Sequence, residues 1–110
     1  MNRFAGQTVF VTGGNKGIGR GIATRFAQEG ANVAIAAIEK DTPEAAAAIA
    51  AETGAKVLGL QLDVTDPAAI REAYAAAEAT LGALSVSVQN AGVITIAKVE
   101  DLTEREWDLN

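Results

Sequence analysis

The stretch TVFVTGGNKGIG, residues 8–19, decides the fold of this chain. The apolar run from Thr8 to Val11 predicts a buried strand, and four glycines follow it between Thr12 and Gly19. Glycine loses more backbone freedom than any other residue when it becomes ordered, so four glycines at one turn need a reason. A glycine-rich turn between a strand and a helix directs backbone N–H groups and a helix N-terminus to one point, which attracts phosphate. The stretch therefore predicts a strand, a phosphate-binding loop and a helix, in that order.

Beyond this loop the chain keeps alternating between helix and strand patterns. Helices are predicted at 18–29, 42–53 and 67–81, and further strands at 32–38, 57–62 and 84–88. Thr42 and Asp66, each followed by proline, are the expected helix caps. A further helix should start near Trp107, where Thr103 and Glu106 have the spacing of a capping box. The predicted fold class is α/β: a Rossmann-like doubly wound parallel sheet, β-α-β-α-β-α-β plus the start of a further helix, and incomplete.

The composition fits a globular domain and excludes several classes of function. The chain has 110 residues, a net charge of -5 and no run of basic residues, which argues against a nucleic-acid surface. It has no cysteine and no histidine, so it offers no disulfide, no Cys/His zinc site and no serine–histidine triad. No apolar run approaches the ~18 residues of a membrane span, and the first residues lack the pattern of a signal peptide. A cytoplasmic protein that uses no metal is expected.

Unusual glycine or polar clusters follow the first, third and fourth predicted strands. They are residues 12–19, Asp63 and the run Asn90 to Gly92. Ligands of open α/β sheets bind outside the carboxyl ends of the strands. Because the three clusters should meet at that edge, they predict a single ligand site.

The spacing of the glycines separates this loop from better-known phosphate loops. It is neither G-x-G-x-x-G nor a P-loop, but T-G-x-x-x-G-I-G. That pattern resembles the short-chain dehydrogenase/reductase family. Leu62-Asp63-Val64 is similar to the family's acidic residue after the third strand. Gln89-Asn90-Ala91-Gly92 is similar to its Asn-Asn-Ala-Gly motif, with Gln89 in place of the first asparagine.

The resemblance implies NAD(P) as cofactor and assigns roles to the glycine loop. Gly13, Gly17 and Gly19 would shape the loop around the pyrophosphate. Asn15 and Ile18 would contribute to the same site from their backbone. A tight structural turn without a ligand is the alternative for such a loop.

The two later motifs would hold the rest of the dinucleotide, as the resemblance implies. Asp63 would accept a hydrogen bond from the adenine amino group, and the Val64 N–H group would donate to the ring. Asn90, Ala91 and Gly92 would line the path to the ribose on the nicotinamide side. The alternatives are that Asp63 is only a helix cap or turn residue, and that the Asn90 motif is only a structural turn.

The choice between NAD and NADP depends on four residues, and NADP is favoured. NAD sites carry an acidic residue at the end of the second strand that binds the ribose 2′-hydroxyl, and by register Ala37 occupies that position. Lys16 resembles the basic residue found in NADP-using relatives, and Arg20 lies one turn away. Glu39 argues the other way, because it could turn toward the ribose and favour NAD.

The reaction of the family is hydride transfer between the cofactor and a carbonyl or alcohol, which needs a serine, a tyrosine and a lysine. This chain has no such triad. Tyr74 lacks a lysine four residues later and lies on an apolar helix face, so it is expected in the core. Asn110 is a doubtful candidate for the family's catalytic asparagine, because it comes only three residues after Trp107.

Residues 1–110 are therefore expected to be the dinucleotide-binding N-terminal part of a longer single-domain oxidoreductase, a homo-oligomer (dimer or tetramer) in its full length. A physical argument supports the longer chain: the fourth strand, 84–88, would otherwise form an uncharged, unpaired sheet edge. The alternatives are a non-catalytic dinucleotide-binding module and a sensor that binds NADP without turnover.

Overall fold

The computed structural model describes residues 3–63, 65–90 and 94–98. Along the chain, their elements are β1 (Thr8–Thr12), α1 (Gly17–Gln28), β2 (Asn32–Ala37), α2 (Thr42–Thr53), β3 (Val57–Gln61), α3 (Pro67–Leu81), β4 (Leu84–Asn90) and β5 (Ile94–Lys98). The predicted β-α-β-α-β-α-β order is confirmed. The helix expected near Trp107, with Thr103 and Glu106, lies outside the described residues.

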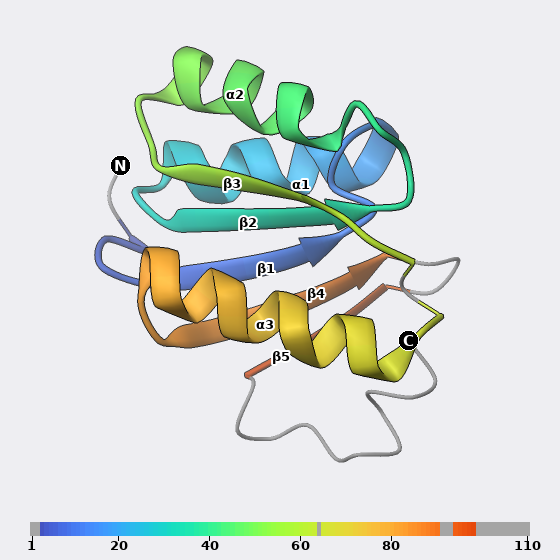
Figure 1. Cartoon of the computed structure of the whole chain (residues 1–110). Coiled ribbons are helices and arrows are strands. Elements are labelled where there is room, and N and C mark those ends of the chain that lie inside the picture. The colour runs from blue at the N-terminus through green and yellow to red at the C-terminus, as the bar shows by residue number, and fades with distance from the viewer. Residues whose placement is uncertain (1–2, 64, 91–93, 99–110) are drawn as a thin grey trace.

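The five strands form one sheet in the order β3-β2-β1-β4-β5 (Figure 1). β1 lies in the centre and pairs in parallel with β2, from Thr8 opposite Asn32 to Thr12 opposite Ala36. β4 and β3 extend the parallel sheet on either side. Each helix returns the chain to the start of the next strand, so the ends of these four strands share one edge. We call it the carboxyl edge.

The strand β4 is not the free sheet edge that the sequence led us to expect. β5 pairs with it in antiparallel fashion, from Val86 opposite Lys98 to Asn90 opposite Ile94. Only residues 91–93 separate the two strands, and a connection this short permits an antiparallel neighbour but not a parallel crossover. The unpaired edge was therefore wrong as an argument for a longer chain.

Helices cover both faces of the sheet (Figure 1). α1 and α2 pack on one face around a core that includes Val11, Ile35 and Ile49, all fully buried. α3 packs on the other face, where Phe10 and Tyr74 meet with ring centroids 4.2 Å apart. Successive strand residues point to opposite faces, which is why neighbours such as Phe10 and Val11 serve different layers. The prediction that Tyr74 belongs to the core is confirmed, because it is 5% exposed.

Two glycines allow other parts of the chain to approach more closely than a side chain would permit. A Cβ atom on Gly59 would lie 2.6 Å from both the Pro43 Cα and the Thr42 carbonyl oxygen. A Cβ atom on Gly14 would lie 2.5 Å from Cγ2 of Ile35. Such distances are too short for real side chains, so Gly59 lets α2 lie low on β3 and Gly14 lets the glycine loop lie against β2.

The starts of α2 and α3 differ in how well the sequence predicted them. Asp66 caps α3 as expected, because its Oδ1 accepts from two N–H groups of the first turn at 3.0 and 3.3 Å. The cap of α2 is Asp41, one residue before the expected Thr42. Thr42 is buried inside the first turn, where its hydroxyl donates to the carbonyl oxygen of Glu39 at 2.7 Å. The expected cap thus fastens the preceding loop instead.

Candidate functional site

The segments that follow β1 and β3 are each fastened to the end of β2 by a backbone hydrogen bond at the carboxyl edge. The Gly13 N–H group donates to the carbonyl oxygen of Ala36 at 2.7 Å, which fastens the glycine loop to β2. The Leu62 N–H group donates to the carbonyl oxygen of Ala37 at 2.9 Å, which holds the end of β3 to β2. The edge is thus a connected surface on which residues from separate loops can act together.

The glycine loop presents an open helix N-terminus. Gly13 and Gly17 have φ angles of 66° and 60°, a left-handed conformation that favours glycine. α1 begins at Gly17, with Lys16 as its cap residue, and Lys16 makes no side-chain capping bond. The first turn of α1 contains no acidic residue, and Ile18 in that turn is 70% exposed. The positive end of the helix dipole therefore carries no acidic residue in its own first turn, which suits a phosphate group.

Asn15 is buried in this loop and its side chain links two loops. It is 3% exposed, and its amide nitrogen donates to Oε1 of Glu39 at 3.0 Å and to Oδ1 of Asp41 at 3.2 Å. Neither bond could be predicted from the sequence, because both partners lie more than twenty residues away. The contribution of the Asn15 backbone to a pyrophosphate site stays a prediction.

Lys16 and Glu39 form an ion pair across the same two loops. The Lys16 Nζ atom lies 3.5 Å from Oε2 of Glu39, with side-chain exposures of 73% and 39%. The hydrogen bond from Asn15 is the main reason that the pKa of the Glu39 carboxyl lies below its ordinary value, and the Lys16 ammonium lowers it further. Glu39 is therefore a carboxylate at neutral pH. Lys16, which favours NADP, and Glu39, which favours NAD, thus contact each other.

Asp63 follows β3 and organises a turn. Its Oδ1 accepts from the Thr65 N–H group at 2.9 Å and from the Thr65 hydroxyl at 2.6 Å. These two hydrogen bonds lower the pKa of the Asp63 carboxyl. The turn role that was one alternative for Asp63 is present, and the exposed carboxylate remains ionised and able to accept further hydrogen bonds.

Several of the predicted site residues cannot be placed. Val64, Ala91, Gly92 and Asn110 lie outside the described residues. Asn90 is the last residue of β4, where its backbone is opposite Ile94, and its side chain is not described. The predicted roles of these residues stay predictions.

A polar pair that the sequence did not predict lies between β4 and α3. The Tyr74 and Ser87 hydroxyls share a buried hydrogen bond, and burial raises the pKa of Tyr74. Gln89 is 3% exposed on the same strand, and its Oε1 has no hydrogen-bond partner in the part of the chain that the structure describes. Alternation along β4 places Ser87 and Gln89 on one face, but only the fold reveals that Tyr74 faces them.

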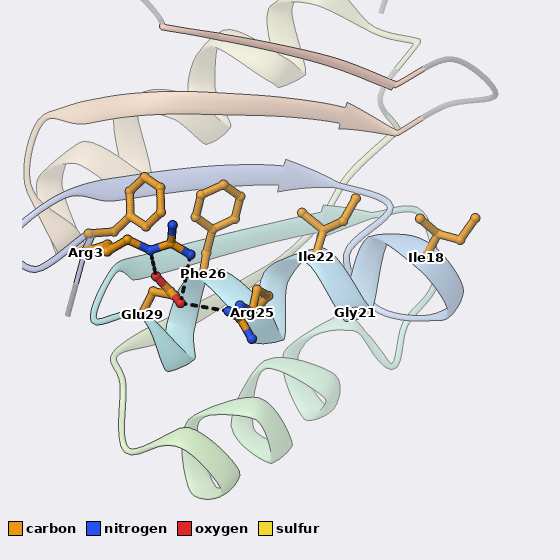
Figure 2. Close-up of a pocket in the computed structure, with 8 residues that line it drawn as sticks. Arg3, Ile18, Gly21, Ile22, Arg25, Phe26 and Glu29 are labelled. Atoms are coloured by element: carbon orange, nitrogen blue, oxygen red, sulfur yellow. Dashed lines mark hydrogen bonds and ion pairs between the residues drawn. The ribbon is translucent and has the colours of Figure 1, made fainter. Parts of the chain in front are cut away.

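A groove of about 480 Å³ lies along α1, on the flank away from α2 (Figure 2). Ile22 and Phe26 line it, and the Phe26 ring meets that of Phe4 edge to face with centroids 4.9 Å apart. Ile18 belongs both to this groove and to the predicted cofactor residues. The groove therefore lies mainly along an apolar flank of α1. It reaches the glycine loop only at Ile18, in the first turn of α1.

Glu29 closes one end of the groove between two arginines (Figure 2). The Arg3 Nε atom donates to its Oε2 at 2.6 Å, and an Arg25 guanidinium nitrogen lies 3.1 Å from its Oε1. The hydrogen bond from Arg3 is the main reason that the pKa of the Glu29 carboxyl lies below its ordinary value. A carboxyl with a lowered pKa stabilises the fold above the pKa of the unfolded chain, and this effect is lost as the pH falls through the folded pKa.

We expect Glu29→Gln to lower the melting temperature at pH 7, because the variant removes the charge that holds both arginines. The gap between native protein and variant should begin to narrow as the pH falls below about 4.3, the ordinary glutamate pKa, where the unfolded chain takes up its proton. It should close only when the pH falls through the lower pKa of the native carboxyl. Thermal unfolding followed by circular dichroism at pH 7 and pH 3 measures both gaps. Glu52→Gln, at an exposed position of α2, is the control for the change in net charge. An equal gap at both values of pH would contradict this account of Glu29.

Neither a metal site nor a membrane span is found in the described part of the chain. In residues 3–63, 65–90 and 94–98, no three acidic side chains gather closely enough to hold a metal ion. Within those ranges, no helix combines the length and the apolar character that crossing a membrane would require.

Comparison with known proteins gives consistent matches. The model of a family described as short chain dehydrogenase matches residues 7–109. The 2-(S)-hydroxypropyl-CoM dehydrogenase 3 of Xanthobacter autotrophicus is 37% identical over 107 residues, which are 97% of this chain and 42% of that protein. The chain thus spans about two fifths of the length of the curated relatives it matches.

Solved structures with the same fold include three that contain a nicotinamide cofactor, and two of them illustrate the similarity. The L-sorbose reductase of Gluconobacter frateurii, complexed with NADPH and L-sorbose, matches with a TM-score of 0.77 and 28% identity over 98% of this chain and 42% of its own. A short chain dehydrogenase of Burkholderia cenocepacia J2315, in complex with NADP, matches with a TM-score of 0.73 and 39% identity over 97% of this chain and 44% of its own.

Proposed function

This chain belongs to the short chain dehydrogenase family, and we propose that the whole protein is an NAD(P)-dependent oxidoreductase. The bound cofactor would supply the chemistry, as acceptor or donor of a hydride exchanged with a carbonyl or alcohol substrate. The observation that carries the proposal is the open N-terminus of α1, which follows the glycine loop at the carboxyl edge without a side-chain cap. The dehydrogenase and reductase names of the matching proteins support the same reaction class.

The residues of the glycine loop fit a pyrophosphate. The space beside Gly17 is open, with no atom within 4 Å of the place that a Cβ atom would take. We propose that Gly13, Gly17 and Gly19 shape the loop around the pyrophosphate, and that Asn15 and Ile18 contribute their backbone. The helix dipole then stabilises the negative charge.

The other loops of the carboxyl edge are proposed to hold the adenosine and the ribose on the nicotinamide side. We propose that Asp63, ionised and exposed, accepts a hydrogen bond from the adenine amino group, and that the Val64 N–H group donates to the ring. Asn90, Ala91 and Gly92 would line the path to the nicotinamide-side ribose. The position of Asn90 at the end of β4, beside the end of β1, supports that assignment.

Within this proposal, residues 1–110 hold the cofactor and the acid–base residues lie elsewhere in the full-length protein. Support comes from the relatives, which are more than twice as long as this chain. We also propose that the protein is cytoplasmic and acts as a homo-oligomer, as the family resemblance implies. Incubating the native protein with NADP and a panel of secondary alcohols, and with NADPH and a panel of ketones, tests the reaction in both directions. Absorbance follows the reduced nicotinamide. Tight binding without turnover of any alcohol or ketone would favour a non-catalytic module or sensor.

We propose further that NADP is preferred over NAD. Lys16 is the cap residue of α1 and its ammonium is largely exposed, so it can reach a 2′-phosphate. Ala37 is the last residue of β2, and it has no carboxylate that would repel a 2′-phosphate. Two similar solved structures were obtained with NADPH or NADP, which supports the same choice.

The double change Lys16→Ala with Ala37→Asp should reverse this preference. It removes the cation expected at the 2′-phosphate and adds a carboxylate that can accept from a 2′-hydroxyl, so the NADP/NAD affinity ratio should fall by at least about tenfold. Calorimetric titration of the native protein and the variant with both cofactors measures the ratio. Lys56→Ala, at the opposite edge of the sheet, is the control for losing one positive charge. An unchanged ratio would contradict the NADP proposal, and failure of either cofactor to bind the native protein would contradict the function itself.

A further inference from the structure

Glu39 is held in place by both its side chain and its backbone. Its carboxylate accepts from the Asn15 amide at 3.0 Å and pairs with the Lys16 ammonium at 3.5 Å. Its carbonyl oxygen accepts from the Thr42 hydroxyl at 2.7 Å. An exposed glutamate on a loop usually samples many rotamers, whereas this one has three partners that fix it beside the glycine loop.

The Lys16 ammonium is therefore partly neutralised by the carboxylate that contacts it. Asn15 draws Asp41 as well as Glu39 toward the loop, with Asp41 Oδ1 at 3.2 Å from the amide nitrogen. Two carboxylates thus meet the Asn15 amide, and one of them, that of Glu39, also contacts the Lys16 ammonium. A phosphate that approaches Lys16 meets an anion already in contact with it.

We propose that Glu39 competes with the 2′-phosphate of the cofactor for Lys16 and so limits the preference for NADP. This inference rests on the proposed function, in which the carboxyl edge binds a nicotinamide dinucleotide. A 2′-phosphate can pair with Lys16 only if the Lys16–Glu39 contact opens or is shared. NAD has a hydroxyl in place of that phosphate and leaves the ion pair intact. Glu39 is thus a specificity-determining residue that acts against one cofactor and not the other.

Because the Lys16–Glu39 pair is exposed to solvent, a phosphate can replace Glu39 as the partner of Lys16. With 73% of the Lys16 side chain and 39% of the Glu39 side chain in contact with solvent, the pair is screened by water and weak. A dianionic phosphate attracts an ammonium more strongly than a carboxylate does. The carboxylate nevertheless stays near, because Asn15 still holds it, and it continues to repel the phosphate. The competition therefore reduces NADP affinity without preventing NADP binding.

The test isolates the 2′-phosphate with two probes, adenosine 2′,5′-bisphosphate and AMP, titrated calorimetrically against the full-length protein. We expect Glu39→Gln to tighten binding of the bisphosphate roughly three- to tenfold and to change AMP binding by less than about twofold. Asp41→Asn removes a charge from the same loop while the Lys16–Glu39 pair remains. The affinity for the bisphosphate should therefore rise less in this variant than in Glu39→Gln. Glu52→Gln, on the far end of α2, should change neither affinity.

A double-mutant cycle shows whether the effect passes through Lys16. In a Lys16→Ala background the gain from Glu39→Gln should be smaller, because no ion pair remains to be displaced and only the direct repulsion between Glu39 and the phosphate is relieved. An unchanged bisphosphate affinity in Glu39→Gln, or an equal gain in both backgrounds, would overturn the inference while leaving the proposed function standing. Failure of the native protein to bind AMP, the bisphosphate or either cofactor would overturn both.

Discussion

Gly59→Ala should destabilise the protein by about 2 to 3 kcal/mol, the upper part of the range of roughly 1 to 3 kcal/mol that is typical when a packed site is overfilled. The added Cβ atom would stand 2.6 Å from the Pro43 Cα and 2.6 Å from the Thr42 carbonyl oxygen. Both neighbours are backbone atoms of the first turn of α2, so no side-chain rotation relieves the contact. The helix would have to move away from β3, and the contacts of the alanine face of α2 with the sheet would loosen.

Urea unfolding of the native protein and the variant, followed by circular dichroism, measures this loss. Gly21→Ala is the matched control, because Gly21 lies within α1 and a Cβ atom there would meet nothing within 4 Å. That substitution should stabilise the protein by roughly 0.5 to 1 kcal/mol, since alanine is the better helix former. If Gly59→Ala were as harmless as Gly21→Ala, the close approach of α2 to β3 would be wrong.

Gly17→Val should weaken NAD(P) binding by more than about 100-fold, which is about 2.7 kcal/mol. Gly17 has a φ angle of 60° and starts α1, and the space beside it is open. In the proposed site that space belongs to the pyrophosphate. A valine side chain would fill it, and a β-branched residue is also strained at a positive φ angle. Fluorescence or calorimetric titration with NADP and NAD measures the affinity.

Gly54→Val separates the loss of binding from the loss of stability. Gly54 ends α2 with a φ angle of 77° and has equally open surroundings, but it lies at the edge of the sheet opposite the glycine loop. Both variants should lose roughly 1 to 2 kcal/mol of stability from backbone strain. Only Gly17→Val should lose the cofactor. Equal cofactor affinity in the two variants would show that the open side of Gly17 is not the binding surface.

The sequence predicted the elements of this fold well because their signals are local. The apolar strand at Thr8–Thr12 stops at glycines, and α3 begins after a proline with Asp66 as cap. Such features act within a few residues of the chain, through backbone conformation and capping bonds. The rule that helices return the chain to parallel strands then accounts for the parallel direction in which β1 pairs with β2 and β4.

What the sequence did not predict depends on contacts between distant segments. β5 departs from the strand–helix alternation, and only its pairing with β4 defines it. Gly14 looked like one more glycine of the phosphate loop, yet its neighbour is Ile35 of β2. Asn15 and Lys16 were assigned to the cofactor from their place in a motif. Their side-chain contacts with Glu39 could be found only once the ends of β1 and β2 were placed side by side.

Asn15 also bears on the entropy of ligand binding. A loop with four glycines would lose much freedom on closing around a ligand, at about 1 to 2 kcal/mol for each residue that becomes ordered. Here a buried amide already bridges two carboxylates of the neighbouring loop, so much of that ordering has taken place during folding. A ligand that arrives at such a preorganised loop keeps more of its interaction energy as affinity. The Asn15 side chain, together with the Gly13 N–H bond to Ala36, therefore helps to hold the glycine loop in its folded position.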